Sequence, residues 1–367
     1  MSERIVIKEI CEVYDGPHAT PKKTVDGPVY LGIDAITDDG KINAKEFAHL
    51  SEEDYIKWTK RVTPQYGDIV FSYEATLGRY ALIPKDFYGC LGRRLAIIRN
   101  VSKDIDTLWL YYYFLSPEWK QFIQSKIIKG STVNRISVED FPTYTVPNIS
   151  IKVQRKIANI LSKIDEKIAL NNNINDNLEQ QMHLIFENMM AKAATHKLSG
   201  EYTIAQNLAT VVTGKEDANF SVPNGKYKFF TCSNTPLSCD EYVFDSSSIL
   251  IAGNGDFNVK HYSGKFNAYQ RTYVLTPDKK YFGLLYLASL YRINSFKSRS
   301  SGSIVKFITK SDVENIPVFI PNDRFYLQEL NKLIYLQEQN KLENELLVNL
   351  RDWLLPMLMN GQATISD

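Results

Sequence analysis

An internal duplication constrains the fold of this 367-residue chain more than any other feature of its sequence. Five residues recur in order at a constant separation: Gly130, Ser131, Val133, Ile136 and Asp140 return as Gly302, Ser303, Val305, Ile308 and Asp312. Leu110 and Tyr112 also return, as Leu284 and Tyr286, at a slightly larger separation. Two unrelated domains with similar turns would also give scattered matches, but the shared order favours one module copied once.

Both halves have the same layout. Short runs of β-branched and aromatic residues come first and predict strands; the corresponding runs are 69–71 with 249–251, and 94–98 with 271–275. An aromatic helix is expected next, around 108–126 in the first half and 281–291 in the second. A proline-containing segment then leads into a long helix. This alternation predicts an α+β fold built from two α/β domains, each followed by a long helix.

Apolar residues in both long helices follow steps of four and three, which is the heptad period of a coiled coil. The predicted helix-pairing seam comprises Ile157, Leu161, Ile164, Ile168, Asn171, Asn175, Leu178, Leu330, Leu333, Asn340, Asn344 and Leu347. A buried Asn weakens a coiled coil but fixes its register and partner. The two helices are therefore expected to pair as an antiparallel coiled coil, although each could instead pack only on its own domain.

The expected domain boundaries follow from these patterns. They are a first domain at 1–150, a central helix at 151–192, a linker at 193–201, a second domain at 202–322 and a distal helix at 323–360. Proline lacks a backbone donor and clashes with the preceding turn. Pro356 is therefore expected to break the distal helix near its end.

The residues associated with catalysis are sparse. Five histidines and four cysteines show no metal-ligand spacing, and no Gly-rich phosphate loop or Asn-Pro-Pro-aromatic tetrapeptide occurs. The charged opening residues and the lack of a long apolar run predict a cytoplasmic protein with reduced thiols, without a membrane span. A net charge of +1 excludes a strongly basic nucleic-acid tail. A binding protein is favoured over an enzyme, and no metal is expected.

The order of these features resembles the specificity subunit of type I restriction-modification systems. The resemblance extends over nearly the whole chain. It rests on the openings 10–21 and 28–33, the duplicated Gly-Ser-x-Val segment, and the helix starts 153–157 and 327–330.

The resemblance implies two target-recognition domains that each read one half of a split sequence in double-stranded DNA. It also implies that the paired helices space the two domains and dock two methyltransferase subunits. S-adenosylmethionine would come with the methyltransferase, and no cofactor is expected in this chain. A nuclease-translocase subunit can join such an assembly.

DNA contact requires cations for phosphates and hydrogen-bonding side chains for base edges. Candidates in the first domain are His18, Thr20, Lys22, Lys23, Arg79, Arg93 and Arg94. Candidates in the second domain are Asn254, Asp256, Asn258, Lys260, His261, Arg271, Lys297 and Arg299. Arg94 and Arg271 occupy equivalent places in the duplication. Structural arginines, solvated lysines and turn-forming asparagines are the alternative interpretations of these residues.

The two domains share a framework but differ in loop sequence, so an asymmetric target is expected rather than a palindrome. Two other functions fit parts of the pattern. A coiled-coil assembly scaffold would use the helices without reading DNA, and a self-contained DNA-modifying enzyme would need catalytic motifs that the sequence does not show.

Overall fold

The computed structural model describes residues 3–130, 133–255, 257–299 and 307–363, with the side chains of 296–299 excepted. The repeat residues Ser131, Gly302, Ser303 and Val305 therefore lie outside the described part. The fold divides into two compact units. The first unit contains residues 1–168 and 346–367, and the second contains residues 169–345. Each unit therefore includes a part of both long helices.

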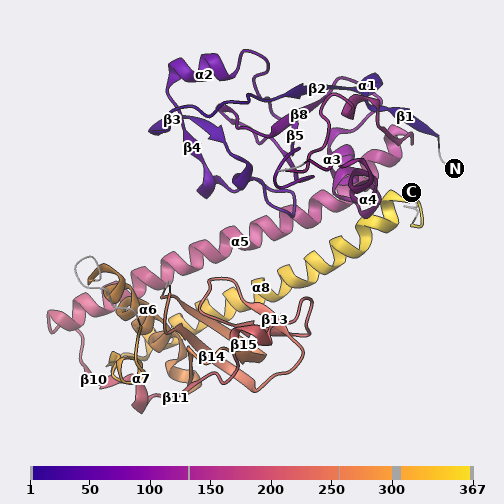
Figure 1. Cartoon of the computed structure of the whole chain (residues 1–367). Coiled ribbons are helices and arrows are strands. Elements are labelled where there is room, and N and C mark those ends of the chain that lie inside the picture. Colours follow the sequence, from indigo (N-terminus) through magenta and orange to yellow (C-terminus); the bar gives the residue numbers. More distant parts are fainter. Residues whose placement is uncertain (1–2, 131–132, 256, 300–306, 364–367) are drawn as a thin grey trace. The chain divides into compact units, whose positions relative to one another are not determined.

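The first unit contains three small sheets (Figure 1). An antiparallel pair joins β1 (Arg4–Val6) to β9 (Thr145–Pro147). The four-stranded sheet has the order β2-β8-β5-β6, with β2 at Cys11–Asp15, β5 at Ile69–Ser72, β6 at Tyr80–Leu82 and β8 at Leu95–Asn100. The three-stranded sheet has the order β4-β3-β7, with β3 at Thr24–Leu31, β4 at Ala48–His49 and β7 at Gly89–Leu91.

The helices α3 (Thr107–Leu115) and α4 (Pro117–Lys126) provide most of the aromatic core of this unit. The sequence predicted one helix here, and the structure has two. Ser116 adopts an extended ψ of 152° because the residue before a proline is disfavoured in the helical region. Its side chain then caps α4 by accepting a hydrogen bond from the Trp119 backbone. The short helices α1 (Ile7–Ile10) and α2 (Glu52–Trp58) complete the unit.

The second unit repeats this plan around a larger sheet. The antiparallel pair β10 (Gly200–Ile204) and β17 (Pro317–Pro321) corresponds to β1 and β9. The six-stranded sheet has the order β11-β16-β14-β15-β12-β13. Its strands are β11 (Ala209–Thr213), β12 (Tyr227–Phe230), β13 (Leu237–Cys239), β14 (Phe244–Ala252), β15 (Val259–Ala268) and β16 (Thr272–Pro277). Two helices, α6 (Phe282–Arg299) and α7 (Lys310–Glu314), follow the sheet.

The strand registers confirm the duplication that the sequence predicts. Ile69 pairs with Ile98 in the first unit, and Ile249 pairs with Leu275 in the second. A further repeat pair makes the same backbone contact: the Ile136 amide donates to the Tyr73 carbonyl at 2.8 Å, and the Ile308 amide donates to the Gly253 carbonyl at 2.7 Å. The main difference between the two units is the length of one strand. The continuous β15 of the second unit corresponds to two separate strands, β6 and β7, in the first.

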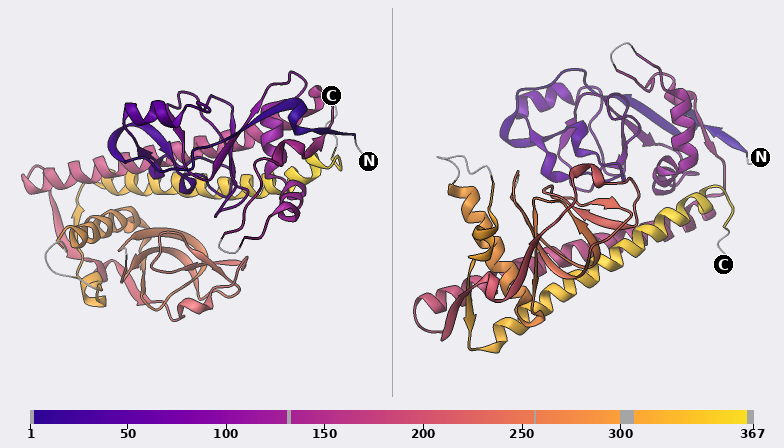
Figure 2. Two further views of the ribbon diagram at one scale, coloured as in Figure 1. Left: turned by 45° about the horizontal axis from the view of Figure 1, so that its top comes forward. Right: turned by 60° about the horizontal axis from the view of Figure 1, so that its bottom comes forward.

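The antiparallel pairing of the helices is present in the second unit. There the C-terminal part of α5 (Ile151–Ala194) lies beside the N-terminal part of α8 (Arg324–Met359) (Figure 2). The amide of Asn171 donates to the side-chain oxygen of Asn344 at 2.9 Å, and the amide of Asn340 donates to that of Asn175 at 2.9 Å. An antiparallel alignment requires this crossed pairing, in which the first Asn of one helix meets the second Asn of the other.

Most predicted seam residues are withdrawn from solvent. Those buried are Ile157, Leu161, Ile164, Ile168, Asn171, Asn175, Leu178, Leu330 and Leu333, while Asn340, Asn344 and Leu347 are half-buried. Ile157 and Leu161 share the first unit's core with Leu358 of α8.

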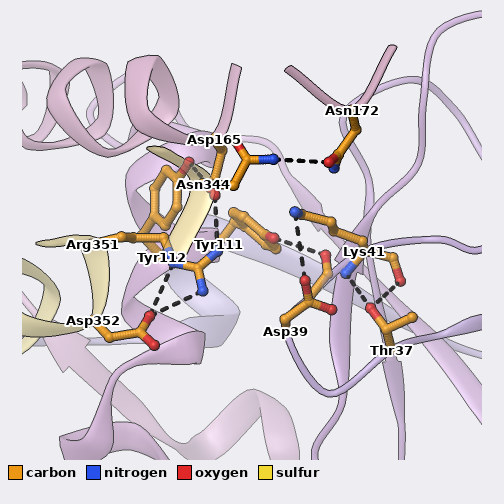
Figure 3. A network of polar contacts seen from close by, with 11 residues as sticks. Thr37, Asp39, Lys41, Tyr111, Tyr112, Asp165, Asn172, Asn344, Arg351 and Asp352 are labelled. Carbon is orange, nitrogen blue, oxygen red and sulfur yellow. Dashed lines mark hydrogen bonds and ion pairs between the residues drawn. The ribbon is translucent and has the colours of Figure 1, made fainter. Parts of the chain in front are cut away.

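A polar network lies within the same helix pair in the first unit (Figure 3). Arg351 of α8 binds the Asp165 carboxylate of α5 at 2.9 Å, and the Tyr112 hydroxyl donates to the same carboxylate at 2.7 Å. The two seams align with a separation of 169 residues, as for Asn171 with Asn340. This alignment makes Ile334 the equivalent of Asp165, and Met182 the equivalent of Arg351. Both of these residues are buried, so one seam holds an ion pair where the other is apolar.

Pro356 does not break α8, contrary to the prediction. The helix continues through this residue to Met359. Proline removes only the one bond that its own nitrogen would donate. The final turn is retained because Leu355, Leu358 and Met359 are all buried in the first unit's core. No helix within the described residues is both long and apolar enough to cross a membrane.

We predict that the Asn171→Ala substitution lowers the stability of the second unit. It would leave the Asn344 oxygen and the Glu343 carboxylate, which accepts from Asn171 at 2.7 Å, without this donor. Loss of one buried partner costs about 1–3 kcal/mol. The midpoint of urea unfolding should fall accordingly.

The matched control is Asn173→Ala, because Asn173 is exposed on the same helix. The double variant N171L/N344L removes both ends of the hydrogen bond and should recover most of the loss. Equal midpoints for N171A and N173A would contradict a pairing role for Asn171.

Candidate DNA-recognition surface

Several loops of the first unit leave the four-stranded sheet at the same edge. The register pairs Asp15, the last residue of β2, with Ala96 near the start of β8. It also pairs Ser72, the last residue of β5, with Leu95. The loops 16–23, 73–79 and 92–94 therefore begin or end beside one another. We call this group the first loop edge.

The second unit has the corresponding edge. Thr213 at the end of β11 pairs with Tyr273, and Ala252 at the end of β14 pairs with Thr272. The loops 214–226, 253–258 and 269–271 meet there, and we call this group the second loop edge. In each unit, loops that carry DNA-binding candidates predicted from the sequence thus lie together at one sheet edge.

Equivalent glycines keep the two edges compact. The Gly16 amide donates to the Leu95 carbonyl, and the Gly214 amide donates to the Thr272 carbonyl, each at 3.0 Å. A Cβ atom would lie 2.4 Å from the Leu95 oxygen at Gly16, and 2.0 Å from the Ala268 oxygen at Gly214. Any larger residue would therefore push the first loop of each edge away from its sheet.

The loop that follows β2 carries an exposed cationic segment. His18, Thr20, Lys22 and Lys23 are all exposed, and the His18 ring lies 2.9 Å from the Asp15 carboxylate. The Trp58 indole holds this loop by donating to the Ala19 carbonyl at 3.2 Å. In the described part of the chain neither lysine makes an ion pair. The two lysines are therefore available to phosphates.

Two candidate arginines of the first edge are held by their own unit. Arg79 binds both oxygens of Asp38, at 2.6 and 3.1 Å, and also donates to the Ile36 carbonyl. Arg94 adopts a φ of 70° and binds Glu74 at 3.0 Å. Arg93 is different, because its side chain is exposed while its backbone amide is held by the Tyr30 hydroxyl. The structure thus favours a positioning role for Arg79 and Arg94.

The candidate residues of the second edge also differ in whether their polar groups are already bonded within the protein. The Asn258 amide donates to the Cys232 carbonyl at 2.8 Å, and its oxygen accepts from Lys260. Both ends of this amide are therefore engaged within the protein. Burial lowers the pKa of Lys260 to about 8. Asn254 is half-buried and Arg271 is exposed.

His261 lies against the long helix rather than at the loop edge. Its Nδ1 is 2.9 Å from the Glu338 carboxylate, and its Nε2 is 3.3 Å from both the Gln337 oxygen and the Lys341 ammonium. Its side chain is buried, and burial lowers its pKa although Glu338 opposes the shift. The contacts of His261 therefore join β15 to α8. Three other candidates, Asp256 and the side chains of Lys297 and Arg299, lie outside the described residues.

Sequence reasoning missed the residues that decide which cations are free. Glu74, Asp38 and Trp58 belong to no motif, yet they hold Arg94, Arg79 and the lysine loop. One sequence signal could have indicated the different environments of Arg94 and Arg271. The alignment of 69–71 with 249–251 places Glu74 opposite Asn254, so a charged residue in one half corresponds to a neutral residue in the other.

The part of the chain that the structure describes can be compared with the ligand sets of metal sites. Among the described residues no group of three or more His, Cys, Asp or Glu side chains could hold a metal ion. The four cysteines are unpaired, and burial raises the pKa of Cys11 and of Cys90 to about 12.

Two duplicated domains, each with a loop edge and a long helix, define a class of modular recognition protein. Residues 2–180 and 208–349 match the family described as the type I restriction modification DNA specificity domain. The chain belongs to this family of specificity subunits, which are non-catalytic.

Particular relatives support this assignment. The specificity subunit of the type I restriction enzyme EcoDI from Escherichia coli is 36% identical over 164 residues, which span 43% of this chain and 37% of that protein. A Methanocaldococcus jannaschii chain assigned as the MjaX specificity subunit is 23% identical over 98% of this chain and 93% of its own length. The crystal structure of the type I S subunit from M. genitalium shares the fold, with a TM-score of 0.59, 17% identity and coverage of 99% and 96% of the two chains.

We predict that Lys22→Ala combined with Lys23→Ala weakens binding of the full chain, in complex with its partner subunits, to every duplex sequence alike. Each lost phosphate contact should reduce the slope of log affinity against log salt by about one. The double variant should therefore reduce the slope by about two in a fluorescence anisotropy series.

The control is Lys8→Ala with Lys103→Ala. Both are exposed and lie near Cys11 and Asn100, which pair at the opposite end of the sheet. An unchanged slope for K22A/K23A, or an equal change for K8A/K103A, would contradict the assignment.

The buried His261 should make the stability of the second unit depend on pH. The ring's pKa is lower in the folded state than its usual value of about 6.5. Below that pH the unfolded chain takes up a proton that the folded chain does not. Stability should therefore be complete above about pH 6.5 and fall as the pH is lowered towards 5.

Urea unfolding of the wild type and of His261→Gln between pH 7.5 and 5 tests this expectation. The wild type should lose more stability over this range than the variant. Parallel pH profiles would show that His261 does not titrate with unfolding.

Proposed function

We propose that this chain reads a split, asymmetric DNA target for a type I restriction-modification complex, with each recognition domain contacting one half. The observation that carries the proposal is the repetition of one loop edge on two equivalent sheets with different side chains. The framework residues Gly16 and Gly214 are the same in both units. The exposed cations differ in kind and place: the first edge carries Lys22, Lys23 and Arg93, and the second carries Lys215, Lys226 and Arg271. Unlike surfaces on like frameworks suit unlike half-sites.

We further propose that methylation, and any cleavage, belong to partner subunits. S-adenosylmethionine would be bound by the methyltransferase, and double-stranded DNA would be held jointly by that subunit and this chain. Two methyltransferase copies and a nuclease-translocase complete the assembly in this proposal. The duplication supports two copies, because it provides two equivalent domain-and-helix units.

The exposed faces of the long helices support partner docking. In the second unit Leu170 and Leu184 of α5, and Tyr335 and Leu342 of α8, are exposed. In the first unit Leu346, Leu350 and Trp353 of α8 are exposed, and they follow one another at helical spacing. Exposed apolar patches commonly mark protein interfaces. We assign these faces to the methyltransferase subunits.

A coiled-coil scaffold without DNA reading would use the same helix faces. The two hypotheses differ at the loop edges, since a scaffold needs no free cations there. Lys22, Lys23 and Arg271 are exposed without ion pairs in the described part of the chain. This arrangement favours DNA reading.

A domain exchange tests the proposal. Residues 1–150 would be replaced by the first recognition domain of another specificity subunit, and the hybrid would be expressed with its methyltransferase. We expect one half of the methylated motif to change and the other to remain, as mapped by sequencing of modified bases. Exchange of 202–322 is the matched control and should change the opposite half.

Two results would contradict the proposal. A palindromic motif for the wild-type complex would exclude an asymmetric target. An unchanged motif in both hybrids, together with DNA binding that does not depend on salt, would favour the scaffold.

A further inference from the structure

Backbone contacts show that Glu74 and Asn254 occupy equivalent positions beside equivalent arginines. The Tyr73 amide donates to the Arg94 carbonyl at 3.0 Å, and the Gly253 amide donates to the Arg271 carbonyl at 2.8 Å. The next residue forms an isolated bridge in each unit: Glu74 pairs with Arg135, and Asn254 pairs with Phe307. The two positions therefore correspond in space as well as in sequence.

The carboxylate at this position neutralises the arginine of the first unit. The Glu74 oxygen lies 3.0 Å from the Arg94 Nε, and only 35% of the Arg94 side chain is exposed. A base contact by Arg94 would have to break this half-buried ion pair. In the first domain the arginine is therefore a part of the loop framework.

The second unit has a neutral residue instead. Asn254 carries no charge, and across the described residues no carboxylate lies within ion-pair distance of Arg271, whose side chain is exposed. The Arg271 carbonyl accepts from the Gly253 amide and from the Cys232 thiol at 3.5 Å. Its backbone is thus fixed at the loop edge, while its guanidinium makes no ion pair with any carboxylate of the described residues.

We propose that the exchange of Glu74 for Asn254 makes Arg271, and not Arg94, a guanine-reading residue. This inference rests on the proposed function, since it specifies one contact of the second domain. A free guanidinium on a fixed backbone suits the two acceptors O6 and N7 of guanine, which arginine binds bidentately. The first domain lacks this contact because Glu74 occupies its arginine.

The test uses the full chain in complex with its methyltransferase and a pool of 40-bp duplexes of random sequence. Bound duplexes are recovered and sequenced for the wild type and for Arg271→Ala, Arg271→Lys, Asn254→Glu and Glu74→Asn. The wild type should enrich a split motif with a guanine in the half assigned to the second domain by domain exchange. Lys103→Ala is the control and should leave the motif unchanged.

The variants have distinct expected results. R271A should reduce discrimination at that guanine by about tenfold or more. R271K should lose the discrimination but retain salt dependence, because lysine keeps the charge without the bidentate geometry. N254E should behave like R271A, and the double variant N254E/R271A should lose no more than R271A. E74N should create a new guanine preference in the other half of the motif.

Two kinds of result would overturn the inference. If R271A weakens binding to all sequences equally and lowers the salt slope by about one, Arg271 contacts a phosphate instead. If N254E and E74N leave both halves of the motif unchanged, position 74/254 has no part in reading. A wild-type complex without salt-dependent binding or an enriched motif would instead refute the proposed function. Equal urea midpoints for the wild type and the variants show that folding is retained.

Discussion

The rest of the structure depends on hydrogen bonds between asparagines that are largely withdrawn from water. Asn171 with Asn344, and Asn175 with Asn340, can each be satisfied in only one register of the second unit's helix pair. A one-turn slip would set one asparagine of each helix opposite the other but would leave the remaining two amides without these partners, at a cost comparable to a lost hydrogen bond for each group. Apolar seam residues would tolerate such a slip far better. The polar residues therefore set the alignment of α5 with α8 within the second unit.

The sequence predicted the framework well, for an identifiable reason. The duplicated strands repeat the same kinds of residue in the same order, and this order determines how neighbouring strands pair. The sequence alignment of Ile69 with Ile249 accordingly matches the observed strand register in both units. The heptad seam likewise predicted that the two long helices pair. The division of the aromatic helix at Ser116 was missed although the following proline signals it. The persistence of α8 through Pro356 depends on tertiary burial, which sequence periodicity does not report.

The candidate site was less predictable because availability to DNA depends on neighbours distant in sequence. Arg79 and Arg93 cannot be distinguished by residue type. Asp38 binds Arg79, whereas no carboxylate of the described chain binds Arg93. His261 carries the same chemistry as His18, but strand alternation directs it towards Glu338. Charge pattern predicted which loops carry exposed cations, and their contact with DNA stays a prediction. It could not separate a cation that holds a loop in place from a cation that the loop presents to a ligand.

The ion pair of Asp165 with Arg351 constrains the evolution of the long helices more than that of the recognition domains. A chain assembled from two copies of the first half would set Asp165 against a methionine, and one from two copies of the second half would set Arg351 against an isoleucine. The first would leave the half-buried Asp165 without its counter-ion, which is destabilising, and the second would leave Arg351 with the neighbouring Asp352 alone. The two recognition domains can therefore diverge or be exchanged by recombination. The two long helices must instead be inherited together, because Asp165 of one pairs with Arg351 of the other.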